Sequence, residues 1–220
     1  RALLKEAERF ADPDLAFEAS YLRAEMLFAE GNLSEAEGIL VRILAGRPAA
    51  PRSFDALYRL AMIRLSRGDP DNALIQFRKV RDGAPDPFKK TLARAGILEC
   101  HAANRDWNRV LVAAREVLEG SDDASSLTPR VLETIAIAWR ELGNDGNAEK
   151  FSRRILTDFP RSYQAFALRT GGEVTPGASS PDGSRPGGVF GAAGPVPRSA
   201  ADSGAVRTGG ASAADTLLGG

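Results

Sequence analysis

The chain offers one pair of adjacent side chains of the types used in nucleophilic catalysis, Cys100 and His101. A cysteine nucleophile needs a histidine base within hydrogen-bonding reach. Adjacent residues of a helix point about 100° apart, so these two side chains do not meet, and the sequence has no second histidine. We therefore expect a buried thiol beside a partly exposed imidazole, and we predict no catalytic residue and no enzyme activity.

Two acidic segments carry side chains of the kind that bind metal ions. Asp12-Pro13-Asp14 and Asp69-Pro70-Asp71-Asn72 supply carboxylates, but neither has the alternating spacing and closing glutamate of a calcium loop. No cluster of cysteine and histidine provides the three or four ligands of a zinc site. Aspartate before proline is typical of a helix boundary. We therefore expect capping residues here, and no metal ion or other cofactor.

Three arginines near Trp107 are the best candidates for a contact with nucleic acid: Arg105, Arg109 and Arg115. Acidic residues lie among them, which indicates a solvated helix face of mixed charge. The whole chain carries 29 basic and 29 acidic residues, so its charge favours neither nucleic acid nor an anionic membrane as a partner. We also expect no membrane insertion, because no apolar run approaches the roughly 20 residues of a membrane span.

The strongest pattern in the sequence is a repeat of small residues, turns and prolines with a period of 37 or 38 residues. Residues 17–48, 54–85 and 129–160 align position for position. Such a period indicates stacked helix pairs, in which glycine and proline end the helices and alanine allows two helices to cross closely. The recurrent residues are Ala24, Ala61 and Ala136 in first helices, Gly31, Gly68 and Gly143 in turns, Ala36, Ala73 and Ala148 in second helices, and Pro48, Pro85 and Pro160 at the ends.

A degenerate unit fills the gap between the second and third clear units, over residues 88–121. Its sequence predicts helices over 89–103 and 107–119. Leu98 stands where the other units have alanine, and Asn104-Arg105-Asp106 replaces the glycine turn. After Pro160, residues 162–169 predict a short terminal helix, since an array of this kind needs an element that covers its apolar end.

Together the units predict an all-α fold, an α-α superhelix of about four helix pairs. We expect residues 1–16 to be the end of a preceding repeat, with Ala2 to Phe10 in its second helix, and residues 17–169 to be the repeat domain. Residues 170–220 are rich in glycine, alanine, serine and proline. This composition predicts a disordered linker or tail, because it cannot bury enough apolar surface to offset the entropy of ordering.

The clear units resemble the tetratricopeptide repeat. The matching residues are Leu57, Leu60-Ala61, Gly68, Ala73, Phe77, Val80 and Pro85 in the second unit, and Leu132, Ile135-Ala136, Trp139, Gly143, Ala148, Ile155 and Pro160 in the last. The period here is longer than that of the family, and the surplus lies in links such as residues 47–53. That link and the joint Asp158-Phe159-Pro160-Arg161-Ser162 are similar to bacterial cell-envelope members, of the type of the outer-membrane assembly lipoprotein and the Tol-Pal accessory protein.

The resemblance implies a binding groove, because in that family the first helix of each unit lines a concave face. Tyrosine, methionine, phenylalanine and arginine are also enriched at protein interfaces. We do not expect the family's clamp for a terminal carboxylate, since Tyr21 and Glu25 stand where it has lysine and asparagine. The expected groove residues are Tyr21, Glu25, Phe28, Tyr58, Arg59, Met62, Arg130, Glu133 and Arg140, with Leu22 and Leu65 on the same exposed side.

The resemblance thus implies a non-catalytic scaffold that presents its groove to a segment of a partner protein or peptide. We expect this scaffold to act in the assembly or maintenance of a bacterial envelope, in the periplasm or at the outer membrane. A cytoplasmic location is the alternative. A second reading makes the repeats a regulatory or positioning arm of an enzyme, for example one active on the cell wall, with its catalytic domain outside these 220 residues. Self-association through the ends of the array is a further alternative.

Overall fold

The computed structural model describes residues 12–119 and 127–171, which form nine α-helices and no strand. The predicted all-α fold of helical repeats is therefore confirmed for this part of the chain. The expected helix over residues 2–10 and the expected tail, from residue 172 on, lie outside the described residues. The chain divides into two compact parts, each larger than one repeat. From here on we call residues 1–104 the first unit and residues 105–220 the second unit, and we use the word repeat for a single helix pair.

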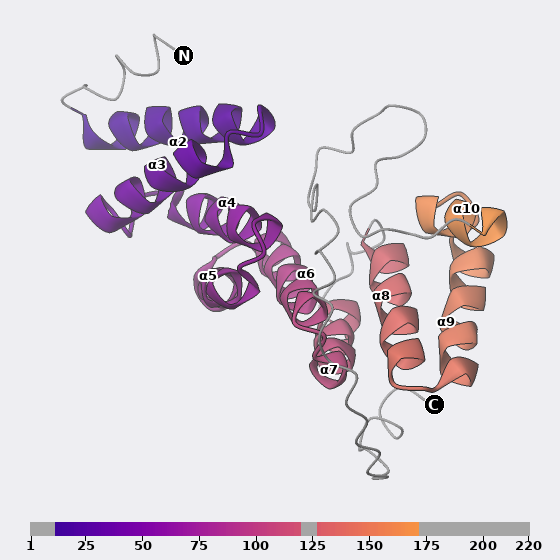
Figure 1. Cartoon of the computed structure of the whole chain (residues 1–220). Coiled ribbons are helices and arrows are strands. Elements are labelled where there is room, and N and C mark those ends of the chain that lie inside the picture. Colours follow the sequence, from indigo (N-terminus) through magenta and orange to yellow (C-terminus); the bar gives the residue numbers. More distant parts are fainter. Residues whose placement is uncertain (1–11, 120–126, 172–220) are drawn as a thin grey trace, which may run out of the picture. The chain divides into compact units, whose positions relative to one another are not determined.

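The first unit consists of consecutive helices that pack against their neighbours in the chain. The helices are α2 (Pro13–Ala29), α3 (Leu33–Gly46), α4 (Ser53–Ser66), α5 (Pro70–Gly83) and α6 (Pro87–Ala103). Each helix contacts the next, and α4 also contacts both α2 and α6 (Figure 1). The first helices of successive repeats, α2, α4 and α6, therefore lie in series. We call the surface that they share the first-helix face.

The second unit contains α7 (Trp107–Glu119), α8 (Thr128–Glu141), α9 (Asp145–Asp158) and the short α10 (Tyr163–Thr170). The start predicted for α7, at residue 107, is the one observed, and the helix reaches the last described residue before the gap, Glu119. Helix α8 packs on both α7 and α9, and α10 contacts both α8 and α9. Figure 1 shows α10 at the end of the α8–α9 pair opposite the turn that joins them. The predicted terminal helix is therefore confirmed, and its start is fixed by Ser162, whose Oγ accepts a hydrogen bond from the Ala165 N–H.

The glycine turns have the geometry that requires glycine. Gly31, Gly68 and Gly143 have φ values of 82°, 78° and 78°, in the left-handed region where a side chain is costly. Each turn closes in the same way, as when the Asn32 N–H donates to the Leu27 carbonyl at 2.9 Å, which satisfies carbonyl groups at the helix end. In the degenerate repeat Arg105 takes this place with φ 55°, so the predicted substitution of the glycine turn is confirmed.

The acidic segments are helix caps, as expected. Asp12, Asp69 and Asp86 each accept a hydrogen bond from a backbone N–H in the first turn of the following helix. A proline follows each of them, at a helix position where its missing N–H costs nothing. Because their oxygens are used in this way, these carboxylates define where α2, α5 and α6 begin.

The recurrent alanines are buried, as expected of residues at which helices cross. Ala24, Ala61, Ala36 and Ala73 are completely buried, and their counterparts in the second unit, Ala136 and Ala148, are 4% and 2% exposed. The sequence did not reveal a further close contact in the degenerate repeat. Gly96 of α6 lies against the Phe77 ring of α5, and a Cβ atom on Gly96 would come within 2.5 Å of Phe77 Cε1.

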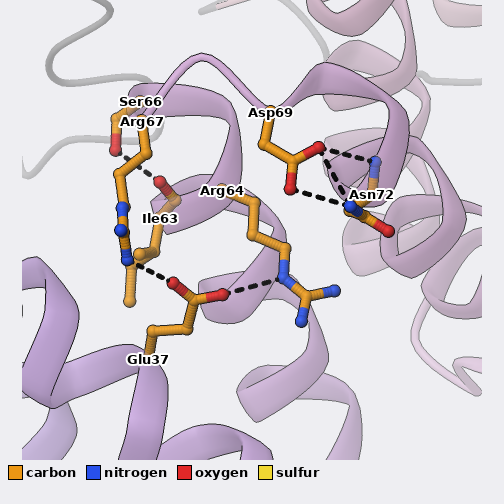
Figure 2. A network of polar contacts seen from close by, with 7 residues as sticks. All are labelled: Glu37, Ile63, Arg64, Ser66, Arg67, Asp69 and Asn72. Atoms are coloured by element: carbon orange, nitrogen blue, oxygen red, sulfur yellow. Dashed lines mark hydrogen bonds and ion pairs between the residues drawn. The ribbon is translucent and has the colours of Figure 1, made fainter.

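An ion-pair network fixes the packing of α3 on α4. Glu37 of α3 accepts from Arg64 Nε at 3.1 Å and from Arg67 Nη1 at 2.6 Å, both in the last turn of α4 and its C-cap (Figure 2). Glu37 and Arg64 are only 22% and 20% exposed, so water screens this pair little. A few residues on, Asp69 caps α5 by accepting from Asn72. Polar contacts thus hold the α4–α5 turn at the end of α4, through Arg64 and Arg67, and at the start of α5, through Asp69.

We predict that Gly96→Ala destabilises the fold although alanine is the better helix former. The gain in helix propensity is about 1 kcal/mol, and the clash with the buried Phe77 ring costs more, so we expect a net loss of about 1–2 kcal/mol. Gly38→Ala in α3 is the matched control, because a Cβ there meets no atom within 4 Å. Urea unfolding should show opposite signs for the two variants. A stabilised Gly96→Ala chain would contradict the close contact.

Candidate partner-binding face

The groove residues predicted for the first two repeats lie together on the first-helix face of the first unit. Tyr21, Glu25 and Phe28 are on α2, and Tyr58 and Arg59 are on α4, which contacts α2. The structure therefore brings these side chains near one another, and most of them contact each other instead of standing apart as separate anchors.

Arg59 is the centre of these contacts. Its Nε and Nη2 donate to the two oxygens of Glu25 at 2.5 and 2.6 Å, a paired geometry that is among the strong polar contacts of proteins. The guanidinium also lies over the Phe28 ring, 4.3 Å from its centroid. Arg59 and Glu25 are only 18% and 26% exposed. Because a half-buried charge is costly without its partner, this cluster ties α4 to α2.

A second arginine repeats the arrangement seven residues earlier. Arg52, the N-cap of α4, pairs with Glu18 at 2.8 Å, and its guanidinium lies 5.5 Å from the centroid of the Tyr21 ring. Glu18 is 34% exposed and Arg52 is 46% exposed, so water reaches this pair more than it reaches Glu25 and Arg59. The combination of an acidic side chain, an aromatic ring and an arginine therefore occurs twice on these two helices, and the two copies lie two helical turns apart.

Burial raises the pKa of Tyr21 well above its ordinary value, and the neighbouring Glu25 carboxylate adds to this effect. The hydroxyl is therefore protonated at neutral pH and can donate a hydrogen bond to Glu25. This donor adds to the two from Arg59, so Glu25 is held by residues of both helices.

The next pair of first helices keeps only part of this pattern. Asp55 of α4 pairs with Lys89 of α6 at 2.7 Å, at the positions that correspond to Glu18 and Arg52 in the preceding repeat. Tyr58 of α4 lies edge-on to Phe77 of α5, with ring centroids 5.5 Å apart. Together with the Glu18–Arg52 and Glu25–Arg59 pairs, the Asp55–Lys89 pair forms what we call the ion-pair ladder.

Two of the predicted groove residues are buried, so the expectation that they would be exposed is wrong. Tyr21 is 8% exposed and Met62 is 4% exposed. Arg52 covers the Tyr21 ring. Met62 belongs to α4, which has a first helix on either side. The helical register alone did not predict this burial, and Tyr21 is part of the hydrophobic core of the first unit.

The candidates of the last repeat, Arg130, Glu133 and Arg140, lie on α8 in the second unit. Arg130 and Glu133 are half-buried and engaged by other groups, and Arg140 is exposed. They are therefore a separate set from the candidates on α2 and α4.

Sequence reasoning missed the partners Arg52 and Lys89. A signal for them exists, because each acid of the ladder is followed by its basic partner 34 residues later. That interval is shorter than the period of 37 residues by about one helical turn. Each basic residue therefore lies about one turn before the position that corresponds to its acid in the preceding first helix.

The described residues hold no group of three or more side chains placed to bind a metal ion. Cys100 is buried, and burial raises the pKa of its thiol to about 12, so the thiol is protonated at neutral pH and is a poor nucleophile. Within the same part of the chain no helix is long and apolar enough to cross a membrane. The contacts that the structure shows on the first-helix face are ion pairs, hydrogen bonds and aromatic contacts.

Comparisons with known proteins agree with this geometry. A model of the tetratricopeptide repeat matches residues 55–86, which contain most of α4 and all of α5. A solved tetratricopeptide repeat protein from Parabacteroides merdae is similar in fold, with a TM-score of 0.57 and 18% identity, over 70% of this chain and 57% of that protein. The chain therefore spans little more than half the length of that structure. No curated protein matches the chain.

We predict that Glu25 and Arg59 couple strongly although they are not fully buried. A double-mutant cycle with Glu25→Ala and Arg59→Ala should give a coupling energy of about 1–3 kcal/mol in equilibrium unfolding. The control is the Glu149–Arg153 pair of α9, which is equally short at 2.6 Å but 63% and 72% exposed. Its coupling should stay below about 0.5 kcal/mol. Equal coupling in the two cycles would contradict the role assigned to Arg59.

Proposed function

We propose that this tetratricopeptide-like array is a non-catalytic scaffold for protein–protein interaction, and that its first-helix face holds an extended or helical segment of a partner. The observation that carries the proposal is the contact of α4 with both α2 and α6. This contact makes three helices one continuous face with polar groups repeated along it. Arrays of helical repeats generally bind partners on such extended faces.

The ion-pair ladder suggests how a partner is recognised. The Glu18–Arg52 and Asp55–Lys89 pairs are between 25% and 46% exposed, so their outer edges can exchange hydrogen bonds with a polar or mixed-charge segment. Tyr58, Arg59 and the half-buried Leu65 flank them on α4. Arg130, Glu133 and Arg140 of α8 are a separate set of proposed contacts, within the second unit. Tyr21 and Met62 are not included as contacts, because they are buried.

We further propose that the scaffold acts in a bacterial envelope, in the periplasm or at the outer membrane. The support is the joint between repeats, which resembles that of envelope members of the family. In this joint Ser162 caps α10, and Pro160 and Arg161 precede it. The link of residues 47–52 between α3 and α4 is also longer than the three residues between α5 and α6.

The test is site-specific photocrosslinking in cells that carry the gene. A photoreactive residue at Leu65 probes the first-helix face, and one at Ile75, which is 49% exposed on the second helix α5, is the control. We expect a defined adduct with an envelope protein from position 65 and none from position 75, since a groove contacts its partner from one side.

Three other results would change the proposal. Adducts of the same kind from both positions, or none from position 65, would contradict binding at the first-helix face. Adducts with cytoplasmic proteins alone would remove the envelope role and leave the scaffold.

A further inference from the structure

We draw no further inference here: the strongest candidate, the exposed apolar pair Leu22 and Met26 on helix α2, carries no proposal because nothing in the described part of the chain shows what covers it.

Discussion

The structure of the first unit depends on the seating of each first helix against the first helix of the repeat before it. Arg59 shows the constraint most clearly, since it binds the Glu25 carboxylate and lies over the Phe28 ring at the same time. A charge that is 18% exposed is costly to bury unless these partners stay in place. The small, buried Ala24 and Ala61 allow the helices of each repeat to approach closely, and the glycine turns return the chain for the next helix.

The contacts that join successive first helices limit which side chains are free to contact a partner. The aromatic and arginine residues that a partner would find most attractive are the ones that join the repeats, and Tyr21 is almost completely covered. What remains for a partner is the outer edge of the ion-pair ladder. If the proposed scaffold binds its partner here, stability and recognition share residues on this face. A substitution there changes affinity partly by changing how the repeats are held, and its effect on binding has to be measured together with its effect on unfolding.

Much of the fold could be predicted from the sequence, because Ala61, Gly68 and Pro85 act through local chemistry that recurs in each repeat. The start of α7 and the capping role of Asp69 follow from the same local rules. The candidate site could be predicted only in part. Helical register tells on which side of its own helix Met62 lies, but the burial of Met62 depends on where the neighbouring helices lie. The contact of Gly96 with Phe77 likewise joins residues of two different repeats.

The central claim, that Arg59 holds the first repeat on the second, is tested most directly by native-state hydrogen exchange of an Arg59→Leu variant. Exchange resolves the free energy of local opening helix by helix. The account predicts that amides of α2 exchange at least about tenfold faster than in the unaltered chain, while amides of α8 and α9 keep their protection. Unchanged protection of α2, or an equal loss in every helix, would contradict it.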